Sequence, residues 1–310
     1  IMLTLAAPTH ASGDFLYGDA DDSGAVDVGD AITILRYVVG LTPLEGSGYL
    51  AADVDGSSEV DVADAILVLR KIVSLIEYFP AEIALNEAIA AVERAESSQL
   101  QEDVNAARLL VSNLPDIPPK AELSARLDAV QAAIDAAAKA AAIQAAIAAI
   151  DGLPDLSAMT LADKADVEAA RALVDTAKND HGAVDADITN LAKLEAAEAF
   201  IAALEAADAA VAAAEASQAQ ADVDYARTLV AALPDGVAKT ALNARLDAVQ
   251  AAIDAAAAKA AAIAAAIAAI DALPDLSEMT LEHKDAVEAA RGLVNIAKND
   301  HGAVDADITN

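Results

Sequence analysis

The sequence predicts an all-α fold, in which a duplicated loop-and-helix module precedes an elongated array of alanine-rich three-helix bundles that share long helices. Hydrophobic residues make up 56% of the 310 residues but aromatic residues only 3%, and alanine fills most of the difference. Alanine at this density favours long helices. Two internal repeats also divide the chain near Pro80, one of 34 residues before it and one of about 120 residues after it.

The composition excludes several classes of function. The chain has 51 acidic and 19 basic residues, for a formal net charge of −32. Such a surface repels phosphate groups, so nucleic acids and anionic membranes are poor partners. Cysteine is absent, which rules out disulfides and thiolate chemistry. Tryptophan is absent too, which argues against platforms that stack sugars or bases.

The first element is an apolar stretch, residues 1–11, which ends in the small-x-small pattern Thr9-His10-Ala11. It reads as the remnant of a secretory signal peptide, with a disordered apolar leader as the alternative. We therefore expect a secreted, extracellular protein at the cell surface. No stretch of 18 uncharged apolar residues is present, so no transmembrane segment is expected. The first and last residues suggest a fragment of a longer chain.

The next element, residues 12–80, contains two acidic loops of the same register, Asp19–Asp30 and Asp53–Asp64, and each runs into an apolar helix. Oxygen-bearing side chains occupy loop positions 1, 3, 5, 9 and 12, and position 7 offers its backbone carbonyl. The candidate metal ligands are Asp19, Asp21, Ser23, Ala25, Asp27, Asp30, Asp53, Asp55, Ser57, Glu59, Asp61 and Asp64.

This spacing is EF-hand-like and predicts two Ca²⁺ ions, because calcium takes six to eight hard oxygen ligands, whereas Mg²⁺ tends to keep its waters. The alternative is a pair of solvated acidic turns. Position 6 is Gly24 in the first loop but Ser58 in the second. A serine is strained in a left-handed turn, so we expect the second site to be the weaker one.

The duplicated block resembles a type I dockerin, a paired calcium-loop module that docks onto cohesin modules of extracellular bacterial assemblies. The likeness rests on the two loops, on aspartate at position 12, on the lack of an entering helix, and on the Ile-Leu-Arg and Val-Leu-Arg helices. It implies a cohesin-like or other extracellular protein partner, possibly a copy of the chain itself. The implied partner-binding residues are Val28, Gly29, Leu35, Arg36, Val62, Ala63, Leu69, Arg70 and Lys71. Ordinary core packing and solvated arginine are the alternative for the helix residues.

The remaining elements are helices separated by Leu-Pro-Asp turns. Helices are expected near 82–97, 98–113, 119–151, 160–178, 187–216, 217–232, 237–271 and 280–297. Ser98 and Ser217 are expected to open capping boxes, and Thr160 and Thr280 to act as N-caps. The 35-residue helix 237–271 has a heptad seam and is too long for one small bundle, so it should end one bundle and start the next.

These spacings predict three-helix bundles at 81–137, 138–205 and 206–256, with a partial bundle at 257–310. The array resembles spectrin-like rods and FIVAR-type repeats of bacterial surface proteins. No catalytic, phosphate-loop or nucleotide motif is found, which favours a non-catalytic docking and structural protein with the rod as a spacer. Two alternatives remain. The chain could be part of a polysaccharide-degrading glycoside hydrolase whose catalytic domain lies outside it, or a self-assembling surface-layer or filament subunit.

Overall fold

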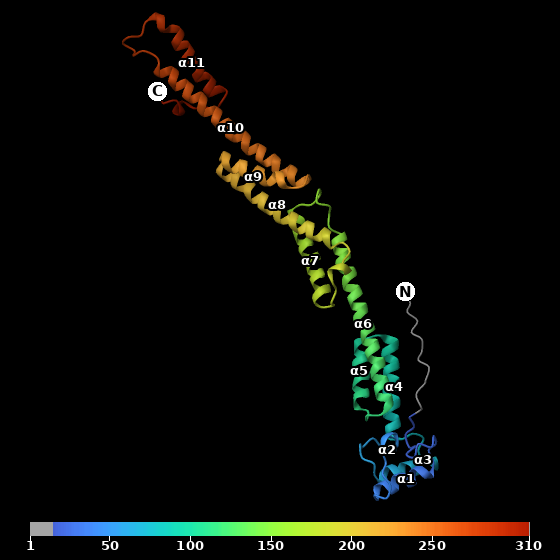
Figure 1. Ribbon diagram of the computed structural model, residues 1–310. Helices are drawn as coiled ribbons and strands as arrows, with labels where there is room; N and C mark the ends of the chain where they lie inside the picture. Colours follow the sequence, from blue (N-terminus) through green and yellow to red (C-terminus); the bar gives the residue numbers. More distant parts are fainter. Residues whose placement is uncertain (1–14, 310) are drawn as a thin grey trace. The chain divides into compact units, whose positions relative to one another are not determined.

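The computed structural model describes residues 15–309, and the chain divides into two compact units, residues 1–140 and 141–310. Every regular element in the described residues is helical, with eleven α-helices and four short 3-10 helices (Figure 1). The all-α prediction is confirmed, with a loop-and-helix module followed by a helical array. The expected signal remnant, residues 1–11, lies outside the described residues.

The duplicated module contains the helices α1 (Val28–Val38), α2 (Gly46–Ala52) and α3 (Val62–Ile72). The helices α1 and α3 pack against each other and bury equivalent residues, Ile34 and Val68, completely. Each begins at an aspartate N-cap that closes a capping box. Helix α2 was not expected from the sequence, because it is short and begins with Gly-Ser-Gly.

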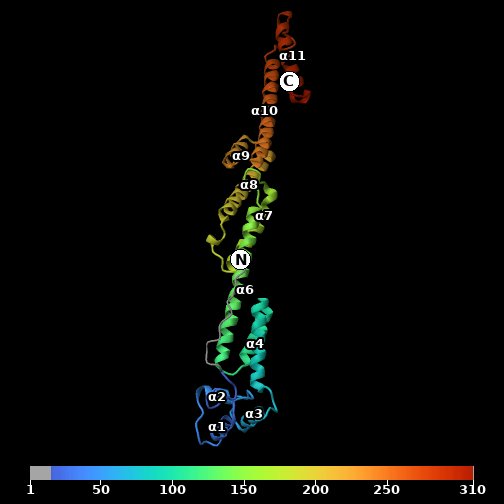
Figure 2. The same cartoon turned by 90° about the vertical axis from the view of Figure 1, so that its right-hand side faces the viewer.

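Three further helices complete the first unit: α4 (Pro80–Ser98), α5 (Gln101–Asn113) and the first part of α6 (Pro118–Asp151). They lie side by side in Figure 1, and Figure 2 shows α4 beside α6 from a second direction. One continuous core joins them to the duplicated module, and it runs from Tyr17 through Phe79 to Val130. Phe79 is fully buried at the point where the module meets α4.

The second unit contains α7 (Lys164–Asn179), α8 (Leu191–Ser217), α9 (Gln220–Ala232), α10 (Val237–Asp271) and α11 (Lys284–Asn299). Its main core extends from Ala146 to Val249, and α8 lines it along its whole length, from Leu194 to Ala214. The helix α8 therefore packs first beside α7 and then beside α9 and α10. A smaller, separate core joins the end of α10 to α11.

Two of the predicted helix boundaries are wrong. Ser98 and Ser217 are the last residues of α4 and α8, and neither opens a capping box. The next residues, Gln99 and Gln218, adopt a left-handed conformation with φ of 51°, which ends each helix. Thr160 caps the 3-10 helix Leu161–Asp163 that precedes α7, since its hydroxyl accepts a hydrogen bond from the Ala162 amide (3.3 Å). The hydroxyl of Thr280 accepts no such capping hydrogen bond at the equivalent position.

Ion pairs link neighbouring helices at repeat-equivalent positions. Arg126 of α6 donates two hydrogen bonds to Glu96 of α4, at 2.8 and 2.7 Å. Arg245 of α10 does the same to Glu215 of α8, both at 2.8 Å, and also pairs with Asp208. Alanine seams bury little apolar area per residue, so these bidentate contacts help to fix which helices pair.

The helices α6 and α10 are long and apolar enough to cross a membrane by length and composition alone. This is weak support for a membrane span, because helices of soluble proteins pass the same test. Each carries a lysine, Lys139 or Lys259, near its middle, and a lysine at the bilayer centre costs about 2.5–3.5 kcal/mol. The absence of a transmembrane segment stays a prediction.

Candidate metal centres

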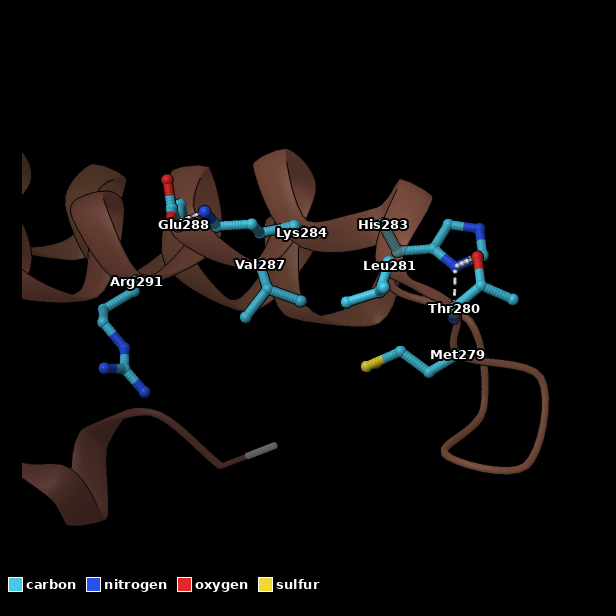
Figure 3. A pocket seen from close by; sticks show the side chains of 8 residues that line it. All are labelled: Met279, Thr280, Leu281, His283, Lys284, Val287, Glu288 and Arg291. Atoms are coloured by element: carbon cyan, nitrogen blue, oxygen red, sulfur yellow. Dashed lines mark hydrogen bonds and ion pairs between the residues drawn. The ribbon is translucent and has the colours of Figure 1, made fainter.

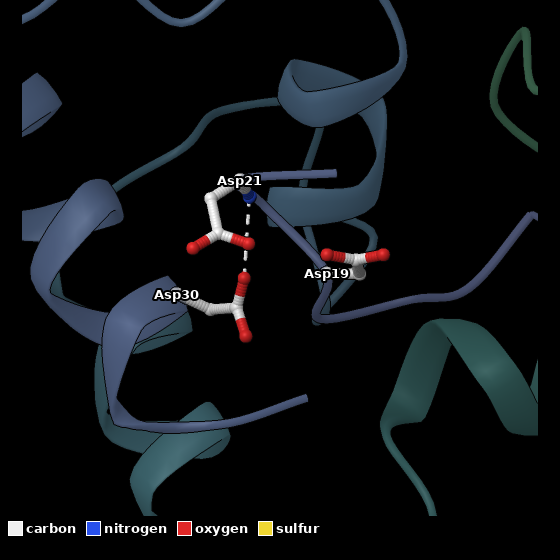
Figure 4. A group of neighbouring side chains, drawn as sticks. All are labelled: Asp19, Asp21 and Asp30. Carbon is white, nitrogen blue, oxygen red and sulfur yellow. Dashed lines mark hydrogen bonds between the residues drawn. The ribbon is translucent and has the colours of Figure 1, made fainter. Parts of the chain in front are cut away.

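Three carboxylates of the first loop converge at the start of α1. The side chains of Asp19, Asp21 and Asp30 each place one oxygen within 4.8 Å of the others (Figure 4). Asp30 is fully buried and Asp19 nearly so, whereas Asp21 is exposed to solvent. The arrangement is a cluster of hard oxygen donors that is open to solvent at Asp21.

Backbone amides hold this triad in place. One oxygen of Asp30 accepts hydrogen bonds from the amides of Ala20 (2.8 Å) and Asp21 (3.2 Å), and the Asp21 bond is drawn in Figure 4. Asp19 in turn accepts from the amides of Ser23 (2.8 Å) and Gly24 (2.9 Å). The loop therefore wraps around its own carboxylates, and the first turn of α1 supplies the last of them.

The second loop repeats this geometry. The oxygens of Asp53, Asp55 and Asp64 also lie within 4.8 Å of one another. Asp64 accepts from the Val54 amide (3.0 Å), as Asp30 accepts from Ala20, and Asp53 accepts from the Ser58 amide (2.9 Å). Two independent segments of the chain thus form the same constellation, which argues against two accidental acidic turns.

The other predicted ligands lie outside these triads. Asp27 and Asp61 cap α1 and α3, where they accept hydrogen bonds from the amides of Gly29 and Ala63, both at 2.6 Å. The hydroxyls of Ser23 and Ser57 donate to the carbonyls of Ala25 (3.3 Å) and Glu59 (3.0 Å). The structure thus brings together loop positions 1, 3 and 12, and the ligand roles of positions 5, 7 and 9 stay predictions.

Burial makes the anionic state of these carboxylates costly. It raises the pKa of Asp30, and it raises the pKa of Asp64 to about 6, with a further contribution from repulsion by Asp55. The backbone amides partly offset both shifts. None of the six carboxylates forms an ion pair with a basic side chain in the described residues. Clustered buried carboxylates without a countercharge suit a divalent cation, so the donor set fits calcium.

Each loop places two residues in the left-handed region, at positions 4 and 6. These are Asp22 (φ 55°) and Gly24 (84°) in the first loop, and Gly56 (77°) and Ser58 (70°) in the second. The serine strain expected at position 6 is present. Position 4, which was not expected to be left-handed, has its glycine in the second loop instead. Each loop therefore carries one strained non-glycine residue. Backbone strain alone gives little reason to expect a lower calcium affinity at the second site.

The predicted partner-binding residues are mostly exposed on α1 and α3. Val28 and Leu35 expose 51% and 39% of their surface, and Val62 and Leu69 expose 47% and 40%. The structure adds Ile32 and Ile66, four residues after each valine and equally exposed; that spacing could have identified them. The exposed residues on each helix therefore form an apolar strip.

One predicted partner-binding residue is engaged within the chain. The Lys71 ammonium lies 2.7 Å from a Glu82 carboxylate oxygen and 4.7 Å from the centre of the Phe79 ring. Its repeat counterpart is Tyr37, which packs edge-on against Tyr49. The two apolar strips are thus alike, but the neighbouring residues Tyr37 and Lys71 make different contacts.

These loops and helices agree with a known family. Residues 17–73 match the dockerin type I domain. The match covers less than a fifth of the chain. Dockerin domains in general are non-catalytic modules that bind calcium and dock onto cohesins. No curated protein and no solved structure matches the chain. The likeness of the helical repeats to spectrin-like or FIVAR-type repeats stays a prediction.

Proposed function

We propose that the chain is a secreted, cell-surface docking protein, in which the dockerin domain binds an extracellular protein when calcium is present and the helical repeats act as a non-catalytic spacer. The observation that carries this proposal is the pair of carboxylate triads, each with two buried members and each placed at the start of a helix with an exposed apolar strip. The sites and the docking surface thus share the same two helices.

The two triads would hold one calcium ion each, with the carbonyls of Ala25 and Glu59 and the hydroxyls of Ser23 and Ser57 as further donors. A bound Ca²⁺ supplies the positive charge that the buried carboxylates lack. Asp30 and Asp64 link each site to its helix, because they belong to the first turns of α1 and α3. Metal binding to such loops supplies folding free energy.

The docking surface consists of the two apolar strips, Val28, Ile32 and Leu35 on α1 and Val62, Ile66 and Leu69 on α3. Exposed apolar side chains grouped on one helix face are typical of interaction sites. Arg36 and Arg70 are exposed beside the strips and can pair with acidic groups of a partner. The match to dockerin domains, which bind cohesins, supports a cohesin-like protein as the partner.

The test is a calcium-dependent pull-down from the extracellular fraction of the source organism, read by mass spectrometry. The wild type should capture a partner in calcium and release it in EDTA. Asp30→Asn with Asp64→Asn should abolish capture, while Asp116→Asn, at a fully solvated position, should not. Equal capture in calcium and EDTA would contradict the proposal. Calcium-dependent sedimentation of the purified protein alone would instead indicate self-assembly.

A further inference from the structure

The helices α2 and α4 begin at equivalent positions of the 34-residue duplication. Helix α2 starts at Gly46, and α4 starts 34 residues later, at Pro80. In the first half of the duplication, Ser47 of α2 donates a hydrogen bond to Asp22 of the first loop (2.8 Å). A Cβ on Gly48 would lie 2.6 Å from the carbonyl oxygen of Ala20. The first loop is therefore covered by α2.

The start of α4 covers the second loop in a similar way. The Ala81 amide donates a hydrogen bond to the carbonyl of Val54 (3.1 Å), and Val54 is the repeat counterpart of Ala20. A Cβ on Gly56 would lie 3.8 Å from the Cβ of Ala81. Both Val54 and Ala81 are buried. The second loop thus packs against the first turn of the helical array, which lies outside the matched residues 17–73.

One residue, Val54, joins the second carboxylate triad to α4. Its amide donates to Asp64 (3.0 Å), and its carbonyl accepts from Ala81. The amides in the first turn of a helix have no partner within the helix, so Ala81 needs this outside acceptor. The turn before α11 differs, because the Thr280 amide donates to the ring of His283 only three residues later (3.0 Å; Figure 3).

The first loop makes no equivalent connection to the helical array. Its contacts with α2 stay within the dockerin domain, and among the described residues no hydrogen bond joins residues 19–30 to α4. The Phe79 ring approaches Gly18, which precedes the first triad. Helix α3 strengthens the connection of the second half, since Lys71 in its last turn pairs with Glu82 of α4 (2.7 Å). The two metal sites therefore differ in what they hold in place.

We propose that the second calcium loop is a metal-dependent hinge between the dockerin domain and the helices α4–α6. Calcium at Asp53, Asp55 and Asp64 holds this loop closed, so that Val54 stays in place and the first turn of α4 stays formed. Without the ion, three carboxylates within 4.8 Å of one another repel each other, the loop opens, and Ala81 loses its acceptor. The inference rests on the proposed calcium binding, and it assigns control of this junction to the second ion and not to the first.

The test is hydrogen exchange of the full chain, read by mass spectrometry at the starts of α2 and α4, beside a calcium titration. The matched variants are Asp21→Asn and Asp55→Asn, because asparagine keeps the oxygen that accepts from the amide of Ser23 (3.1 Å) or Ser57 (2.9 Å). The calcium concentration is chosen to fill the wild-type sites but not a weakened one. Calcium should slow exchange at the start of α4 about tenfold in the wild type and in Asp21→Asn, but not in Asp55→Asn. The start of α2 should show the reverse dependence on the two variants.

The variant Ala81→Pro tests the contact itself. It removes the amide that donates to Val54, and α6 shows that a helix of this chain can begin with two prolines, Pro118 and Pro119. Calcium should still bind at both sites, yet exchange at the start of α4 should no longer depend on it. Because coupling is reciprocal, the second site should lose about fivefold in calcium affinity while the first is unchanged. Ala221→Pro, the same change at the exposed second residue of α9, is the control and should leave the first unit unchanged.

Three results would overturn the hinge. The first is calcium protection of α4 that Asp21→Asn and Asp55→Asn abolish equally, which would mean that the two loops act as one cooperative unit. The second is calcium binding at both loops with no change in exchange at α4, or with a full calcium response in Ala81→Pro. Either outcome would refute the hinge and leave the proposed docking function intact. The third is no calcium binding at either loop, which would refute both.

Discussion

Replacing Phe79 with alanine should destabilise the first unit and loosen the link between calcium and the helices α4–α6. The Phe79 side chain is fully buried between the dockerin domain and α4. Its ring approaches Gly18 so closely that a Cβ there would lie 2.8 Å from a ring carbon. The ring also lies below the Lys71 ammonium, which is held by Glu82 of α4. Phe79 therefore anchors the two parts of the unit to each other.

The expected loss of stability is about 3–5 kcal/mol, the usual range for a buried phenylalanine cut to alanine. For a unit of this size that corresponds to a fall of roughly 10–15 °C in melting temperature. Scanning calorimetry with calcium and with EDTA measures both effects. In the wild type, EDTA should lower the melting temperature of the helices α4–α6 together with that of the dockerin domain. In Phe79→Ala, EDTA should lower the melting temperature of the dockerin domain and largely leave that of α4–α6 unchanged.

Phe200→Ala is the matched control, because Phe200 is similarly buried but belongs to the core of the second unit. It should destabilise that unit and leave the calcium response of the first unit intact. The reasoning would be refuted if Phe79→Ala cost less than about 1 kcal/mol. It would also be refuted if EDTA lowered the melting temperature of α4–α6 in Phe79→Ala as much as in the wild type.

Two further predictions concern the ion pairs between helices. The two hydrogen bonds from Arg126 lower the pKa of Glu96, so this pair should stabilise the first unit above pH 4.5 and lose that contribution as the pH falls below it. Urea unfolding between pH 3 and 6 measures this, and the free energy of unfolding should depend less on pH in Arg126→Met than in the wild type. Arg245 contacts both Glu215 and Asp208, so Arg245→Ala should destabilise the second unit by about 1 kcal/mol, and by more than Arg227→Ala, which loses a single partner. Denaturant unfolding of the two variants makes this comparison.

The sequence predicted the helices well because their physical signals are local. Proline fixes where a helix can begin or end, and the predicted helix 237–271 has the same bounds as α10. Helix ends set by left-handed residues were missed, since Gln99 and Gln218 carry no signal comparable to glycine. Helix α2 was missed because a seven-residue segment that starts with glycine has little helix propensity of its own.

The candidate metal ligands, like the helices, were predicted from the sequence where the signal is local. The register of the loops identified Asp19, Asp21 and Asp30 together, because spacing alone decides which carboxylates can meet. The capping role of Asp27 was not foreseen, although an aspartate directly before an apolar helix is a common N-cap. The contact of Lys71 with Glu82 and Phe79 could not be foreseen either, because it depends on how α4 packs against the dockerin domain.

The left-handed positions of the two loops lead to a final prediction, which separates local strain from local contacts. Ser58→Gly should stabilise the dockerin domain by about 1 kcal/mol, since its hydroxyl makes no hydrogen bond among the described residues and glycine removes the strain of φ 70°. Asp22→Gly should give no such gain. Aspartate tolerates this conformation better, and its carboxylate accepts a 2.8 Å hydrogen bond from Ser47 of α2.

Because folding and calcium binding are coupled in such loops, the gain from Ser58→Gly should also appear as a calcium affinity raised about fivefold at the second site. Calcium titration of both variants beside the wild type measures this, and the melting temperature in calcium gives an independent value. A stronger gain from Asp22→Gly than from Ser58→Gly would contradict the reasoning. In that case backbone strain at position 4, and not at position 6, would limit how well these loops close around the ion.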